Sequence, residues 1–222
     1  EMQRRSLTPN EVTYNQMIDG YARSNNLEAA TQLFDIMSDR KLNPNEISYN
    51  SVIHGYAVQR KTHEAVKWMK QMAQVLLKPT WLSYHGVIRA CGRGSDVEGC
   101  AYWLEEMLHS SLTPDGSTYS LIIDACARNG DSEGARKWFN TLVDAKEVPD
   151  SFSFNSLLSS CARASDAPAA VLWFDRMTMV GHPHCVYSFS TLLDAHSRVG
   201  DYHGAEQAMN EMVQRRMEPN IV

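Results

Sequence analysis

The sequence predicts an all-α protein, a right-handed superhelical α-solenoid of stacked helix-turn-helix units. Three observations predict this fold class: a strict repeat period, two amphipathic stripes in each period, and no competing strand pattern. The period is clearest in the prolines, which recur every 35 residues at Pro9, Pro44, Pro79, Pro114 and Pro149, and return at Pro219. A period of this length, without insertions, is typical of repeat architectures.

Other side chains recur in the same register. The aromatic column is Tyr14, Tyr49, Tyr84, Tyr119, Phe154 and Phe189. A column of small residues is Ala30, Ala65, Cys100, Ala135, Ala170 and Ala205. These columns divide the chain into the end of a preceding repeat (1–10), six repeats (11–45, 46–80, 81–115, 116–150, 151–185, 186–220) and the start of another (221–222). We therefore expect a segment of a longer solenoid, or a solenoid whose ends pack on partners.

Each repeat predicts two helices. The first stripe of the first repeat follows i, i+3, i+4, i+7 spacing at Tyr14, Met17, Ile18 and Tyr21. A polar break follows, and then a second stripe at Leu27, Ala30, Phe34 and Met37. The proline closes the unit because it cannot continue a helix interior. Such a pair buries its stripes only by stacking on its neighbours, which creates an extended concave face.

Composition excludes several classes of protein. The 222 residues are 43% hydrophobic with a net charge of −5, which excludes disordered and collagen-like chains. No apolar run approaches the ~20 residues of a membrane helix. Five cysteines without a CxxC pair favour a reducing compartment over a disulfide framework. No targeting segment is visible at residues 1–5.

Two polar columns are candidates for ligand binding. The first follows each aromatic residue, at Asn15, Asn50, His85, Ser120, Asn155 and Ser190. Asn and Ser are mediocre helix formers, so their recurrence indicates a row of hydrogen-bonding side chains along one groove. The alternative is an ordinary solvent-exposed helix position. The second follows the proline, at Asn10, Asn45, Thr80, Asp115, Asp150, Cys185 and Asn220. These residue types cap helices, and capping can coexist with ligand contact.

Two further columns carry charge and apolar surface. An arginine column ends the first helices at Arg23, Arg93, Arg128, Arg163 and Arg198, with Val58 interrupting it. It serves either the helix dipoles, at ~0.3–1 kcal/mol each, or a ridge of phosphate contacts. The first helices open with Val12, Ile47, Leu82, Phe152 and Tyr187, with Ser117 as the exception. These side chains either stack on bases or pack against the neighbouring repeat.

Catalytic chemistry is not indicated. Cys91, Cys126 and Cys161 share one repeat column and are expected in the core. The cluster His182-Pro183-His184-Cys185 lacks the usual spacing of zinc ligands. No P-loop, GxSxG, HExxH or dinucleotide fingerprint occurs. We therefore predict no enzyme activity, no cofactor, no metal and no small-molecule substrate.

The opening Val12-Thr13-Tyr14-Asn15 and the closing Pro44-Asn45, in a period of 35 residues, resemble the pentatricopeptide repeat family. The likeness covers residues 1–222 and fits pure 35-residue units. The tetratricopeptide repeat has a period of about 34 and a different opening. The resemblance implies single-stranded RNA binding, one base per repeat, read by two side chains.

In the family, the residue after the aromatic pairs with the last residue of the same repeat. The pairs here are Asn15/Asn45 (C), Asn50/Thr80 (pyrimidine), His85/Asp115 (unassigned), Ser120/Asp150 (G), Asn155/Cys185 (pyrimidine) and Ser190/Asn220 (A). The implied register is C-Y-N-G-Y-A, with the apolar column sandwiching the bases and the arginine column contacting phosphates.

The resemblance also implies a place of action: RNA processing, stability or translation in a mitochondrion or plastid. A structural subunit of a ribonucleoprotein assembly, such as an organelle ribosome, is the alternative. A peptide-binding scaffold is a third, which the arginine and Asn columns disfavour.

Overall fold

The computed structural model describes residues 9–217, and within that range every regular element is an α-helix. The chain divides into two compact units, Glu1–Thr113 and Pro114–Val222. The first holds α1 (Glu11–Arg23), α2 (Leu27–Asp39), α3 (Glu46–Val58), α4 (Thr62–Gln74), α5 (Trp81–Arg93) and α6 (Val97–His109). The second holds α7 (Gly116–Arg128), α8 (Ser132–Asp144), α9 (Ser151–Arg163), α10 (Ala167–Met179), α11 (Val186–Arg198) and α12 (Tyr202–Gln214). The predicted all-α fold of helix pairs is confirmed.

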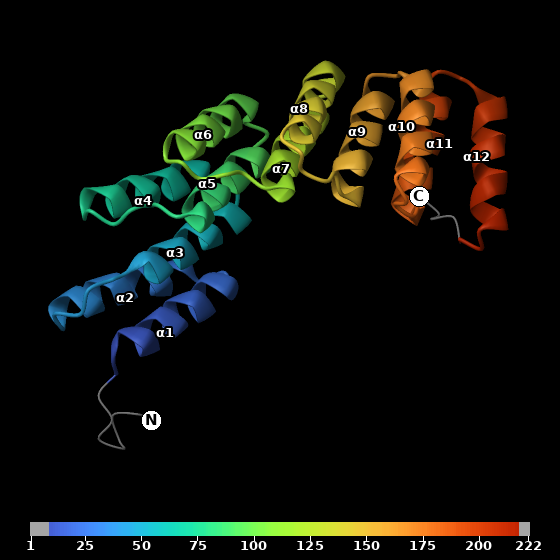
Figure 1. The fold of residues 1–222 in the computed structure, drawn as a ribbon. Coiled ribbons are helices and arrows are strands. Elements are labelled where there is room, and N and C mark those ends of the chain that lie inside the picture. Colours follow the sequence, from blue (N-terminus) through green and yellow to red (C-terminus); the bar gives the residue numbers. More distant parts are fainter. Residues whose placement is uncertain (1–8, 218–222) are drawn as a thin grey trace. The chain divides into compact units, whose positions relative to one another are not determined.

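Both units use the same packing (Figure 1). In the first unit, α3 packs against both α1 and α5, while each of these helices also packs against the helix that follows it. In the second unit, α9 takes the same place between α7 and α11. The odd-numbered helices of a unit therefore form one layer and the even-numbered helices a second.

The core of each unit lies between these two layers. Aromatic side chains meet there, as when the ring of Phe34 lies 5.1 Å from that of Tyr49 and 4.7 Å from that of Trp68. In the second unit, Phe139 makes the equivalent contact with Phe154 at 5.1 Å. The small residue of α2, α4, α6, α8 and α10, such as Ala30, is completely buried, whereas Ala205 of α12 is partly exposed. At the five buried positions it permits close approach of the paired helices.

Helix boundaries follow from local chemistry. Asn10, Asn45, Asp115 and Asp150 each accept a backbone N–H in the first turn of the helix that follows. The predicted capping role is therefore observed at these four positions. Each helix in residues 9–217 is followed two residues later by a residue with positive φ, between 56° and 87°. This left-handed residue ends the helix.

One second helix lacks its cap, which allows a stability prediction. Asn26, Asp96, Asp131, Asp166 and Asp201 cap five second helices, whereas within residues 9–217 the Lys61 side chain makes no capping bond to α4. Lys61→Asp is expected to raise the free energy of unfolding by about 1 kcal/mol. Urea denaturation measures it. Asp131→Ala is the matched control and should lower stability by a similar amount; an unchanged Lys61→Asp midpoint would contradict the assignment.

Candidate functional site

The two polar columns meet at the junctions between successive first helices. In the first unit, Asn15 Nδ2 donates to Asn45 Oδ1 at 3.1 Å. One repeat later, Asn50 Nδ2 donates to Thr80 Oγ1 at 3.1 Å. The Asn45 oxygen also accepts the backbone N–H of Ile47 at 3.0 Å. The residue that begins one helix is thus bonded to a polar side chain of the preceding first helix, so capping and pairing coexist.

A third column, which the sequence analysis did not single out, completes each junction. Its members lie three residues after each capping position and are Thr13, Ser48, Ser83, Thr118, Ser153 and Ser188. The last five are completely buried. Their period of 35 residues was a visible signal, but a hydroxyl in the first turn of a helix is also ordinary capping chemistry.

This hydroxyl fixes the orientation of the asparagine amide. Ser48 Oγ accepts the backbone N–H of Asn45 at 3.2 Å and lies 2.5 Å from Asn15 Oδ1. In this arrangement the Ser48 hydroxyl donates to the Asn15 amide oxygen, while the Asn15 amide nitrogen donates to Asn45 Oδ1. Ser83 holds Asn50 in the same way at 2.6 Å.

The fourth repeat has a hydroxyl in place of the amide. Ser153 Oγ donates to Asp150 Oδ1 at 2.6 Å. Ser120 Oγ lies 2.6 Å from Ser153 Oγ, 2.8 Å from the carbonyl oxygen of Gly116 and 3.4 Å from Asp150 Oδ1. The Asp150 carboxylate also accepts the Ser153 backbone N–H at 2.8 Å. At this junction the capping residue is therefore a charged carboxylate, which only accepts hydrogen bonds, rather than an amide.

The fifth repeat brings its two residues together through a serine. Ser188 Oγ donates to Asn155 Oδ1 at 2.8 Å and lies 3.4 Å from Cys185 Sγ. Burial raises the pKa of the Cys185 thiol, but hydrogen bonds from the Ser188 hydroxyl and the nearby backbone outweigh it, and the pKa lies below its usual value. Cys185 is exposed, whereas the cysteines that were expected in the core are buried.

His85 and Ser190 are the reading residues of the remaining two pairs. His85 is buried at 6% exposure in the first unit, and its ring stacks on Trp81 with centroids 4.6 Å apart. Asp115 caps α7 of the second unit. Ser190 is half-buried on α11, while its predicted partner Asn220 lies outside the described residues.

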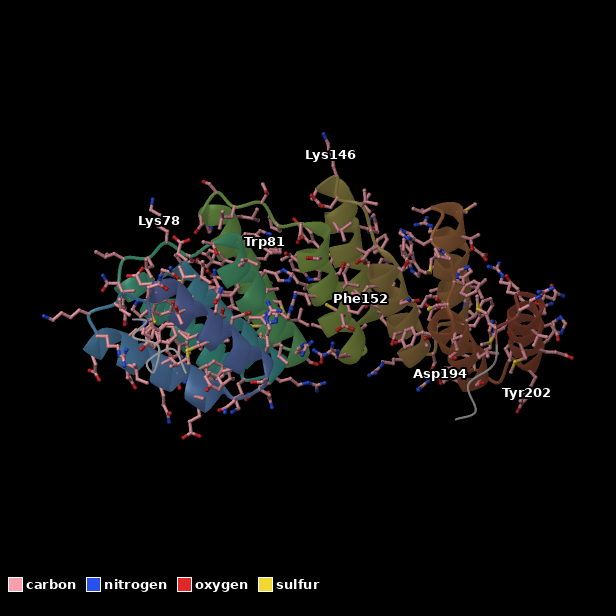
Figure 2. The ribbon with its side chains drawn as sticks, turned by 90° about the horizontal axis from the view of Figure 1, so that it is seen from below. Lys78, Trp81, Lys146, Phe152, Asp194 and Tyr202 are labelled. Atoms are coloured by element: carbon pink, nitrogen blue, oxygen red, sulfur yellow. The ribbon has the colours of Figure 1, made fainter. Side chains whose placement is uncertain are left out.

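The apolar column is exposed rather than buried in the core. Val12, Ile47, Leu82, Phe152 and Tyr187 are 47–61% exposed. In the second unit, Phe152 and Tyr187 line a hollow of about 400 Å³ together with Asn155, which we call the aromatic hollow. Phe152 stands at the start of α9 (Figure 2). Two exposed rings from successive repeats therefore flank one reading residue.

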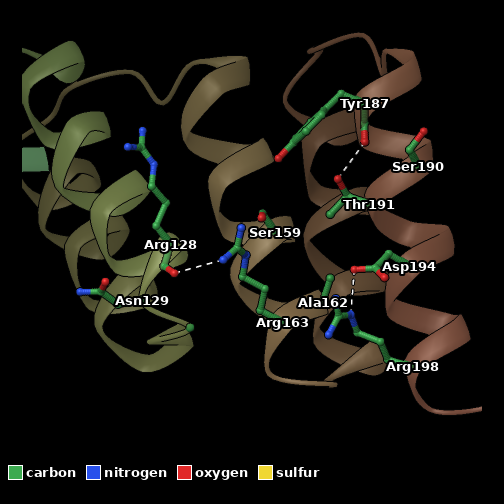
Figure 3. A pocket seen from close by; sticks show the side chains of 11 residues that line it. Arg128, Asn129, Ser159, Ala162, Arg163, Tyr187, Ser190, Thr191, Asp194 and Arg198 are labelled. Atoms are coloured by element: carbon green, nitrogen blue, oxygen red, sulfur yellow. Dashed lines mark hydrogen bonds and ion pairs between the residues drawn. The ribbon is translucent and has the colours of Figure 1, made fainter. Parts of the chain in front are cut away.

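The arginine column borders a second, larger hollow of the same unit. This arginine hollow, of about 670 Å³, is lined by Arg128, Arg163 and Arg198 together with Tyr187 and Ser190. Figure 3 shows the three arginines on α7, α9 and α11, with Tyr187 on the same helix as Arg198. Members of the arginine, apolar and first polar columns thus line one hollow of the second unit.

The arginines also serve the fold. Arg163 Nη1 donates to the carbonyl of Arg128 at 3.1 Å, and Arg93 Nη1 donates to the carbonyl of Val58 at 3.1 Å. Each reaches the end of the preceding first helix, where carbonyls lack helical partners. Arg23, Arg128 and Arg198 form ion pairs with the aspartates one turn earlier, Asp19, Asp124 and Asp194.

The histidines near residue 184 have structural partners. His184 is buried, stacks on Phe174 with ring centroids 3.6 Å apart, and lies 2.5 Å from the hydroxyl of Thr178. His182 Nε2 lies 2.8 Å from the carbonyl of Pro149. Among residues 9–217, no group of three or more His, Cys, Asp or Glu side chains is arranged to hold a metal ion. In the same range, each helix falls short of what a bilayer crossing requires.

Comparison with known families gives matches along the chain. A model of the PPR repeat family matches residues 9–58, 44–93 and 114–163. A PPR repeat model matches residues 82–112 and 152–182, and a pentatricopeptide repeat domain model matches residues 174–222. The comparison with curated proteins gave no significant match.

Solved structures show the same fold. PPR10 in complex with an 18-nt psaJ RNA element is 18% identical with a TM-score of 0.64, over 98% of this chain and 37% of that one. PPR10 from maize is 22% identical with a TM-score of 0.55, over 99% and 41%. The PPR domain of Arabidopsis thaliana protein-only RNase P 1, in complex with tRNA, is 15% identical with a TM-score of 0.71, over 84% and 98%. This chain spans about two fifths of the PPR10 chain.

Proposed function

Because the chain belongs to the pentatricopeptide repeat family, we propose that it binds single-stranded RNA and acts by binding rather than by catalysis. The observation that carries the proposal is the arginine hollow, where Arg128, Arg163, Arg198, the exposed Tyr187 and Ser190 line one surface. Cations, stacking platforms and hydrogen-bonding heads are the three components that single-stranded nucleic acid requires. The complex of PPR10 with an RNA element supports the same class of ligand.

The proposed reading unit is one repeat for one base, with the repeat boundaries at the capping residues. The two linked polar side chains face the base edge, and the exposed side chains at the starts of successive first helices flank the base. The register C-Y-N-G-Y-A follows the pairs given above. We further propose that the protein works on organellar transcripts, in a mitochondrion or plastid.

A role as a structural subunit of a ribonucleoprotein assembly is the second candidate. It is favoured by the third repeat, whose reading residue His85 is buried, stacked on Trp81 and hydrogen-bonded to Arg89. A side chain held in this way has little freedom to select a base.

Fluorescence anisotropy tests the proposal, with a short RNA carrying C-Y-N-G-Y-A against a base-scrambled control over a salt series. The matched RNA is expected to bind more tightly, with a log–log salt slope near −3.5 if five arginines contribute about −0.7 each. Equal binding of both RNAs would favour the structural role. No binding of either RNA would contradict the proposed function.

A further inference from the structure

The third repeat reverses a charge that other repeats share. One turn before the arginine column, α1, α7 and α11 carry Asp19, Asp124 and Asp194, each paired with the arginine four residues later. At the same position α5 carries Arg89, four residues before Arg93. Like charges at this spacing on a helix repel, whereas the Asp–Arg pairs attract. Arg89 therefore gives up the helical ion pair that an aspartate would make with Arg93.

Arg89 is held in a fixed orientation by two imidazoles. Its Nη2 lies 2.8 Å from His85 Nε2, and its Nη1 lies 3.5 Å from His54 Nδ1 on α3. A guanidinium only donates, so the ring nitrogen that faces Arg89 is the acceptor in each of these two contacts. Trp81 stacks on His85 and fixes that ring (Figure 2 marks Trp81 at the start of α5). Within residues 9–217, Arg89 has no ion pair with a carboxylate, so its charge is oriented but not neutralised.

Arg93 brings a second guanidinium to the same place. It donates to the carbonyl of Val58, at the end of α3, which is where the arginine column is interrupted. Burial lowers the pKa of Arg89, and the charge of Arg93 lowers it further. Burial likewise lowers the pKa of His54, with Arg89, Arg23 and Arg93 adding to the effect and Asp19 opposing it. Two guanidinium groups of α5, those of Arg89 and Arg93, therefore lie beside α3.

We propose that His54, Arg89 and Arg93 form an anion site that binds a phosphodiester group of the RNA strand beside the second and third repeats. The inference rests on the proposed function and deepens it. Guanidinium groups match the oxygens of a phosphate with parallel hydrogen bonds. Because Nδ1 of His54 is an acceptor, its proton is on Nε2, which supplies a further neutral donor. The site replaces the phosphate contact that Val58 cannot make.

The decisive variant is Arg89→Asp, which recreates the Asp–Arg pair of α1, α7 and α11 and should fold. With a 5′-hydroxyl RNA carrying the predicted register, we expect its affinity to fall about three- to tenfold. The salt slope should become less steep by about 0.7 for each lost contact. Lys67→Asp is the matched control, since it makes the same change of charge at an exposed site on α4 and should leave the slope unchanged. Arg89→Gln removes the charge without adding another, and should reproduce the loss in weaker form if the aspartate variant unfolds.

The outcomes separate this site from the proposed function. If wild-type protein binds RNA and Arg89→Asp behaves like Lys67→Asp, the anion site is wrong and RNA binding stands. If the effect of Arg89→Asp appears only with a 5′-phosphorylated RNA, the site takes a terminal phosphate and the phosphodiester assignment is overturned. If wild-type protein binds no RNA, the proposed function fails first, and this inference fails with it.

Discussion

Replacing Tyr187 by alanine is expected to weaken RNA binding by about tenfold or more. Tyr187 is 55% exposed and lines both the aromatic hollow and the arginine hollow. A base stacked on an aromatic ring contributes about 1–3 kcal/mol, which corresponds to a factor of roughly 5–150 in affinity. The dissociation constant for the matched RNA, measured by anisotropy, gives the result directly.

Tyr202→Ala is the control for this experiment. Tyr202 is also an exposed tyrosine of the second unit, at 86%, but it stands at the start of the second helix α12 (Figure 2). Its removal should leave the affinity unchanged. Equal losses in the two variants would show that exposed tyrosines contribute non-specifically and that Tyr187 is not a stacking platform. Thermal melting of both variants checks that the fold is intact.

Asp150→Asn is expected to change the preferred base at the fourth position from G to A. The Watson–Crick edge of guanine presents two donors to a carboxylate, whereas that of adenine presents one donor and one acceptor, which an amide matches. Asparagine still caps a helix, so α9 should remain stable. With ~1–3 kcal/mol for a good pair, the ratio of the two affinities should change by about tenfold or more.

The matched control makes the same chemical change at a cap that does not pair with a reading residue. Asp131 caps the second helix α8 by accepting the backbone N–H of Gly134. Asp131→Asn should leave the base preference unchanged, because its effect is limited to that helix terminus. A preference for G that persists in Asp150→Asn would remove Asp150 from the reading pair.

The repeat period made the helices predictable, because an apolar stripe and a capping residue recur in each unit. Tyr14 and Met37 are buried as the stripes require, and Asn45 caps α3 as its residue type predicts. Whether Tyr187 packs or stays exposed could not be decided from the sequence. Helical phase gives the face of a side chain but not the neighbour that covers that face, and the structure leaves this ring half exposed.

Contacts between side chains of different repeats could not be predicted from the sequence for a similar reason. Ser48 follows the pattern of a local capping box, and only the packing of α3 against α1 brings its hydroxyl to Asn15. The arginine column could be seen in the sequence, but the ion pair between Arg198 and Asp194 depends on the rotamers of the two side chains. Arg89 is a further case, since its two imidazole partners come from different repeats.

The residue that caps each first helix has two roles, and this limits which residue types can be substituted there to change the recognised base. A side chain at this position must start a helix and also present a donor or an acceptor to a base, which Asn, Asp, Ser and Thr can do. Substitutions among these four residue types are expected to change the recognised base with little loss in the free energy of unfolding. Cys185 is not one of these four residue types: it stands in a capping box with Ser188, but a thiol is a weaker hydrogen-bonding group than a hydroxyl, an amide or a carboxylate. A protein that evolves by substitutions among these four residue types can therefore recognise new RNA targets without first needing other mutations that raise its stability.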